Sequence, residues 1–181
     1  MRIAVVTLVA LVSFAAFSGP SLAGDVDSQQ IFDRLKALAG TWTGSAVPEG
    51  AAAEHEEEGH DGNVTHQFRV SANGSVVMET MNPGTDHEMI NMYHLDGDEL
   101  MLTHYCAAGN QPRMRLDRDA SAENVLAFDF DGGTNLDPDV DMHIHAARIS
   151  FVEDGHMMSA WTPYMNGEPA GKMTFHLTRS E

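Results

Sequence analysis

The sequence contains two pairs of residues of the types that bind metal ions or polar ligands. Within each pair, the two residues are two positions apart. His143 and His145 form one pair, and His104 and Cys106 form the other. On a β-strand, residues i and i+2 project from the same face, about 7 Å apart at Cα. Imidazole and thiolate are ligands of zinc and copper ions. If both faces turn inward, these four side chains converge on a zinc or copper site. The alternative is that they are polar residues lining a cavity or the surface.

A second group of polar residues lies in a short segment between two expected strands. Asn110 and Gln111 offer amide donors and acceptors, and Arg113 offers a planar guanidinium that pairs with carboxylates or phosphates. Loops often carry ligand-binding residues. The alternative is a structural turn with an arginine paired to an acid, and the sequence leaves both interpretations open.

Catalysis has little support in the sequence. It contains no Gly-x-Ser-x-Gly, phosphate-binding loop or dinucleotide-binding motif. His104 and Cys106 lie on one expected strand, where a nucleophile–base hydrogen bond would need particular rotamers. The sequence therefore favours a binding protein over an enzyme.

The elements that must position these residues are almost all strands. A short helix is expected from a Ser28 cap to about Ala39, with Ile31, Leu35 and Leu38 on one apolar face. Asn-Gly and Asp-Gly pairs, such as Asn166-Gly167, then mark tight turns. Ten strands are predicted, at about 41–47, 63–70, 75–81, 87–95, 98–106, 112–118, 123–130, 141–152, 156–162 and 171–178. An all-β, up-and-down antiparallel barrel uses all ten and removes their exposed edges.

Alternation along the strands predicts which side chains face the interior. Met173, Phe175 and Leu177 share one face of the last strand. On the strand at 98–106, Leu100 and Leu102 share a face with His104 and Cys106, opposite Tyr105. An interior that is partly polar is therefore expected. Residues 48–62 are acidic, lack an apolar period and are predicted to form a flexible loop.

The N-terminus and the composition predict an exported, acidic domain. Arg2, an apolar run over 3–17 and the small residues around Ala23 form a signal peptide at 1–23. Cleavage leaves a domain at 24–181 with no membrane anchor, in the periplasm or outside the cell. The net charge changes from −17 to −18 because Arg2 is the only charged residue removed. This charge argues against nucleic acid or anionic membrane as partners. The single cysteine, Cys106, cannot form an internal disulfide.

The sequence resembles the calycin superfamily, which includes the lipocalins. The resemblance rests on a short helix that leads into Gly40-Thr41-Trp42-Thr43-Gly44 and then a meander of strands. The segments 103–114 and 142–145, together with Trp161, resemble bacterial secreted calycin-like proteins of unknown function. The resemblance implies a barrel with an internal cavity and a basic residue over Trp42, for which Arg179 is the nearest candidate.

A further resemblance is to nitrobindin, a haem-binding barrel with a similar glycine–tryptophan start. It implies a haem-binding histidine near the C-terminus, and His176 lies in that region. Alternation places His176 on the face opposite Phe175 and Leu177, which argues against this role.

The sequence thus predicts an exported, non-catalytic barrel that binds a small, partly apolar molecule. The alternatives are a periplasmic zinc or copper protein, which would use His143 and His145 with His104 or Cys106, and an uncharacterised enzyme or haem-binding barrel. The residues expected to contact the small molecule are His104, Tyr105, Asn110, Gln111, Arg113, His143, His145 and Trp161.

Overall fold

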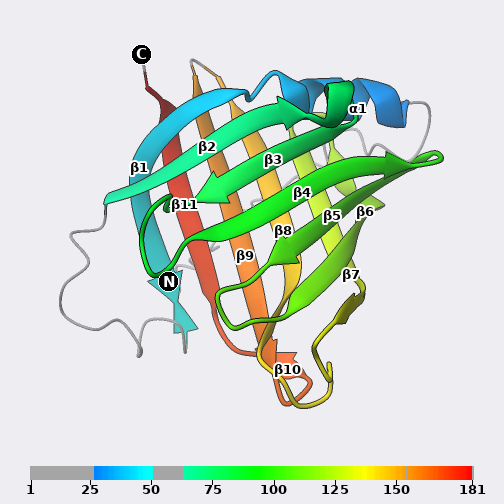
Figure 1. Ribbon diagram of the computed structural model, residues 1–181, viewed down its shortest axis with the longest axis vertical. Coiled ribbons are helices and arrows are strands. Elements are labelled where there is room, and N and C mark those ends of the chain that lie inside the picture. Colours follow the sequence, from blue (N-terminus) through cyan, green and yellow to red (C-terminus); the bar gives the residue numbers. More distant parts are fainter. Residues whose placement is uncertain (1–26, 51–62, 154, 181) are drawn as a thin grey trace, which may run out of the picture.

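The computed structural model is a closed antiparallel β-barrel with one short helix before its first strand (Figure 1). It describes residues 27–50, 63–153 and 155–180. The helix is α1 (Ser28–Lys36), and β10 (Glu168–Pro169) is a two-residue strand paired only with β9. The barrel strands are β1 (Gly40–Glu49), β2 (Asn63–Ser71), β3 (Val76–Met81), β4 (Met89–Asp96), β5 (Glu99–Tyr105), β6 (Gln111–Ala122), β7 (Val125–Thr134), β8 (His143–Val152), β9 (His156–Met165) and β11 (Lys172–Arg179).

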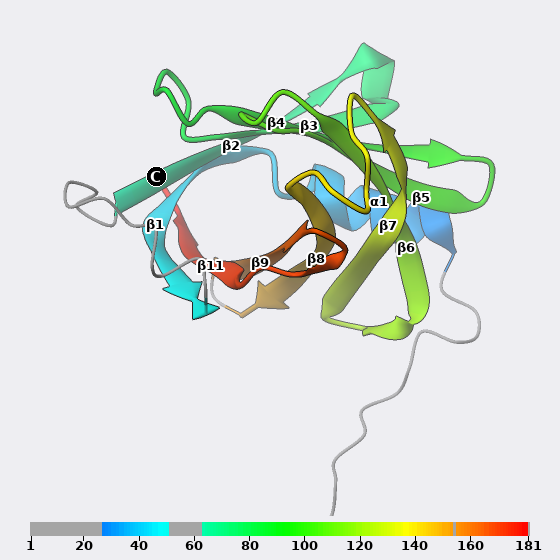
Figure 2. The same cartoon turned by 90° about the horizontal axis from the view of Figure 1, so that it is seen from below.

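Each barrel strand pairs with its neighbours in the sequence. The order runs from β1 to β9, then to β11, and β11 pairs back with β1 to close the ring (Figure 2). Because every barrel strand has a partner on both sides, no long edge is left for another chain to join. All ten predicted barrel strands are present, and the predicted up-and-down topology is confirmed.

A tryptophan and an arginine join the first and last strands to the chain that precedes them. The indole Nε1 of Trp42 donates to the carbonyl of Leu38 at 2.7 Å. The guanidinium of Arg179 lies 4.5 Å from the centre of the Trp42 ring. It also donates to the carbonyls of Ala37 and Ala39, each at 2.7 Å. Arg179 therefore lies over the indole, as the sequence resemblance implied.

The helix begins and ends differently from the prediction. Asp27, not Ser28, is the N-cap, and its carboxylate accepts from the backbone N–H of Gln29. Ser28 is buried and donates instead to the carbonyl of Asp98. The helix ends at Lys36, and the next residues form a turn rather than a continuation to Ala39. The apolar face is nevertheless as expected, and α1 packs against β2, β4 and β5 at one end of the barrel (Figure 1).

Alternation correctly placed three residues of the last strand, although Thr174, expected on the outer face, is also buried. Phe175 and Leu177 are buried, whereas His176 between them is exposed on the outside. On β5, Leu100, Leu102 and His104 are likewise buried.

The strand β5 is one residue shorter at each end than the predicted 98–106. It ends at Tyr105, and Cys106 lies in the following turn, where its N–H donates to Asn110 and its carbonyl accepts from Gly109. These bonds close the turn, so Cys106 does not extend the strand geometry of His104.

Two predicted segments fall mainly outside the described residues. Pro48 and Glu49, assigned to the acidic loop, belong to β1 and pair with Met173 and Lys172. Residues 51–62 of the expected loop and the expected signal peptide at 1–23 lie outside the described ranges. Among the residues that are described, no helix has the length and apolar character needed to cross a membrane.

Candidate functional site

Four polar side chains on consecutive strands point into the barrel. They are His66 on β2, Glu79 on β3, Asn91 on β4 and His104 on β5, and each is at most 1% exposed. Glu79 lies directly opposite Asn91, and Asn91 lies directly opposite His104. We call these four residues the polar ladder. Each belongs to an alternating strand whose other inward positions are apolar, so the ladder is set into the hydrophobic core.

A continuous chain of hydrogen bonds joins the polar ladder. The Oε1 atom of Glu79 lies 2.7 Å from Nδ1 of His66. Its Oε2 atom accepts from Nδ2 of Asn91 at 2.8 Å and from the hydroxyl of Tyr93 at 2.7 Å. The Oδ1 atom of Asn91 lies 2.7 Å from Nδ1 of His104. The carboxylate of Glu79 is therefore the centre of the network.

The charge of Glu79 fixes the direction of these bonds. Burial by itself raises the pKa of Glu79, but His66, Tyr93 and Asn91 stabilise the carboxylate and bring its pKa below the ordinary value. An ionised carboxylate only accepts hydrogen bonds, so Asn91 must turn its NH₂ group toward Glu79. Its carbonyl oxygen then faces His104 and requires a proton on Nδ1 of that ring.

The proton on Nδ1 leaves the other ring nitrogen of His104 as an acceptor. Burial lowers the pKa of His104 to about 4, with a small opposing effect from Glu79. The ring is therefore neutral at pH 7, and its Nε2 atom carries a lone pair and no hydrogen. Because the carboxylate of Glu79 only accepts hydrogen bonds, Nδ1 of His66 must also carry a proton.

The Nε2 atoms of His66 and His104 are the distinctive feature of this interior. Both are buried, and neither has a hydrogen-bond partner among the described residues. Buried polar atoms are nearly always paired, so an unpaired one calls for an explanation. Aromatic side chains of β11 and β9 lie beside them: Phe175 is 4.8 Å from His66 and Trp161 is 5.5 Å from His104, between ring centres. The site therefore combines two unused polar atoms with an apolar wall.

Sequence reasoning found His104 and Trp161 in this site and missed the other ladder residues. His66, Glu79 and Asn91 were each a single polar residue at an inward position of an otherwise apolar alternation. His66 lies two residues before the buried Phe68, and Asn91 lies two before the buried Tyr93. This two-residue spacing from a buried aromatic residue was the signal in the sequence that could have identified them.

The two histidines of the predicted His-x-His pair are hydrogen-bonded to each other. Nδ1 of His143 donates to the carbonyl of Asp141 at 2.9 Å. Nε2 of the same ring lies 3.0 Å from Nδ1 of His145. Since a carbonyl only accepts, the proton on Nδ1 of His143 is directed to Asp141, and a single proton joins Nε2 of His143 to Nδ1 of His145. The nitrogen atoms that would bind one metal ion together are used in this contact.

A slip in strand register explains the position of His145. The β8–β9 pairing shifts between Ile144 and Ala146, so His145 has no opposite residue in β9. Its ring stacks on Tyr164, with centres 3.8 Å apart, and on Phe130, at 4.9 Å. Burial, followed by the charge of its histidine neighbour, lowers the pKa of His145.

The four candidate metal ligands do not gather into one cluster. Over the described ranges, no group of three or more His, Cys, Asp and Glu side chains is placed to hold a metal ion. His104 uses Nδ1 to bind Asn91. Burial raises the pKa of the Cys106 thiol, which disfavours the thiolate form that binds metals.

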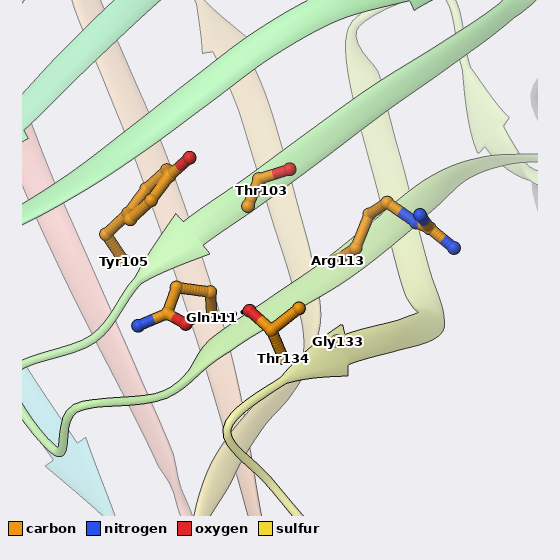
Figure 3. Close-up of a pocket in the computed structure, with 6 residues that line it drawn as sticks. All are labelled: Thr103, Tyr105, Gln111, Arg113, Gly133 and Thr134. Atoms are coloured by element: carbon orange, nitrogen blue, oxygen red, sulfur yellow. Dashed lines mark hydrogen bonds between the residues drawn. The ribbon is translucent and has the colours of Figure 1, made fainter.

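Tyr105, Gln111 and Arg113 lie on the outside of the barrel rather than beside His104. They line an open hollow of about 390 Å³ on the outer face of β5, β6 and β7 (Figure 3). Arg113 donates there to Asp131, through Nε to the carboxylate at 3.2 Å and through Nη2 to the carbonyl at 2.8 Å. Gln111 accepts from Thr134 at 2.7 Å. The structure therefore separates the predicted ligand contacts into an interior group and an outer group.

Asn110 connects the loop after β5 to the start of β8. It is buried, and its Nδ2 atom donates to the carbonyl of Met142 at 2.7 Å. This contact gives Asn110 a structural role in holding the two segments together.

Comparison of the sequence with known protein families and with curated proteins gives no match.

Proposed function

We propose that the chain is an exported, calycin-like barrel that binds a small molecule in its interior without catalysing a reaction. The observation that carries this proposal is the pair of buried, unpartnered Nε2 atoms of His66 and His104. An unsatisfied buried polar group costs about 1–3 kcal/mol. A ligand that bonds to these atoms relieves that cost, so the interior is better suited to an occupied state than to an empty one.

The surroundings of the two histidines support binding rather than simple packing. The polar ladder is built on four adjacent strands, and Nδ1 of His66 and Nδ1 of His104 are each held by a neighbouring ladder residue. Sites on rigid strands bind with little loss of side-chain freedom. Trp161 and Phe175 supply the apolar contact that a small, partly apolar molecule needs.

The calycin-like part of the proposal rests on the first and last strands. The buried indole of Trp42 and the guanidinium of Arg179 over it match what the family resemblance implies. Export rests on the predicted signal peptide at 1–23, and the acidic composition is compatible with a soluble carrier.

Native mass spectrometry with elemental analysis tests the function. The chain is purified from its natural source, and we expect an organic molecule bound in a 1:1 ratio with no stoichiometric metal. His104→Leu should lose this molecule while keeping the circular dichroism of a β-barrel. His176→Leu is the matched control, because His176 is exposed on the outer face of β11, and it should retain the molecule. Stoichiometric metal in place of an organic mass, or an unoccupied chain in every preparation, contradicts the proposal.

A further inference from the structure

We propose that the interior selects small molecules that carry an O–H or N–H donor on an apolar body, and that it rejects carboxylates. This inference rests on the proposed function and names the ligand class of the same site. It follows from the direction of the hydrogen bonds in the polar ladder, which Glu79 sets and Asn91 transmits to His104.

The first step is that Asn91 cannot reverse its amide group. Two donors, Asn91 and Tyr93, meet at Oε2 of Glu79, at 2.8 and 2.7 Å. If the amide of Asn91 turned over, its carbonyl oxygen would face the carboxylate, and two acceptors would be buried in contact. Such a contact leaves both groups unsatisfied in a low-dielectric interior.

The second step is that the fixed amide determines which atom His104 offers to a ligand. The carbonyl of Asn91 holds the proton on Nδ1, so Nε2 presents a lone pair beside the ring of Trp161. A lone pair accepts from an O–H or N–H group and repels a second acceptor. A carboxylate brings only acceptor atoms and a negative charge into an interior that already contains the Glu79 carboxylate.

The third step is that the neighbouring wall favours an apolar body. The rings of Trp161 and Phe175 lie within 5.5 Å of the two histidine rings, and Phe128, Leu102 and Met157 belong to the same buried core. Apolar surface is removed from water when a ligand packs here, which contributes about 25 cal/mol per Å². The site therefore fits an apolar molecule with one or two donor groups, such as a hydroxyaromatic compound or an alcohol.

Three probes of similar size separate these requirements. Phenol has a donor, anisole has the same ring and oxygen without a donor, and benzoate is an anion. Binding of each probe to the mature chain is measured by calorimetry and by ¹⁵N NMR of the histidine side chains. We expect phenol to bind about tenfold more tightly than anisole, as one satisfied hydrogen bond implies. Benzoate should not bind, and phenol should shift the Nε2 signal of His104.

A variant tests the role of Asn91 as a positioning residue. In Asn91→Leu, nothing holds the proton of His104 on Nδ1, so the ¹⁵N spectrum should show a changed tautomer and the preference for phenol over anisole should fall toward unity. His176→Leu should keep both the spectrum of His104 and the preference. A merely structural role for Asn91 predicts lower stability with an unchanged tautomer, which overturns the inference.

The outcomes distinguish this inference from the proposed function. Equal affinities for phenol and anisole, or tighter binding of benzoate, overturn the ligand class and leave binding in the interior standing. If none of the three probes shifts the signals of His104 and Trp161, binding in the interior is overturned as well.

Discussion

Acidification tests the electrostatic description of His104. Burial lowers the pKa of this imidazole from an ordinary 6.5 to about 4 in the folded chain. The unfolded chain therefore takes up the proton first, and the folded state loses stability as the pH falls from 6.5 toward 4. At pH 5 the unfolded ring is almost fully protonated and the folded ring is still neutral. A difference of about 1.5 pH units at 1.36 kcal/mol per unit predicts a loss of about 2 kcal/mol between pH 7 and pH 5.

The assay compares urea unfolding at pH 7 and pH 5, followed by tryptophan fluorescence. The variant His104→Gln cannot titrate, yet its amide can still donate to Asn91. The free energy of unfolding of the wild type should fall by about 2 kcal/mol more than that of the variant, because the other titrating groups are common to both. His176→Gln, a change of an exposed histidine, should behave as the wild type does. Equal losses in the wild type and His104→Gln would refute the reasoning.

Three further predictions concern the polar ladder, the close contact between β1 and β11 at Gly44, and export. Tyr93→Phe removes a donor to the buried carboxylate of Glu79 and should lower the free energy of unfolding by about 2 kcal/mol; a loss below about 0.5 kcal/mol in urea titrations contradicts this. Gly44→Ala would place a methyl group 1.8 Å from the carbonyl oxygen of His176. The free energy of unfolding, measured by circular dichroism, should therefore fall by about 3 kcal/mol or more, or the variant should fail to fold. The intact mass of the exported chain should correspond to cleavage after Ala23, and an uncleaved mass argues against the signal peptide.

The strands and turns could be predicted because their signals are local. Alternation of apolar and polar residues has a period of two, and it correctly placed Phe175 and Leu177 inside and His176 outside. The Asn166-Gly167 pair adopts positive φ at both residues, as a tight hairpin turn requires. Neither signal depends on distant parts of the chain.

Whether a predicted contact residue lies in the interior or on the outer face depends on alternation along its strand and on strand register. His104 and Tyr105 are adjacent on one strand, so one had to face inward and the other outward, and a single site could not contain both. The position of His145 depends on a register slip between β8 and β9. No pattern within β8 alone reports such a slip, because it is a property of two paired strands.

The sequence by itself determined the barrel, its approximate strand boundaries and the inward direction of His104, since these follow from local periodicity and turn residues. Only the tertiary structure decided that Glu79 meets His66 and Asn91, which are 13 and 12 residues away along the chain. The physical reason is register: hydrogen-bond partners across strands are set by how whole strands align, and shifting one strand by a single residue would turn its inward side chains outward. The polar ladder and its two unpartnered nitrogen atoms exist only in that alignment.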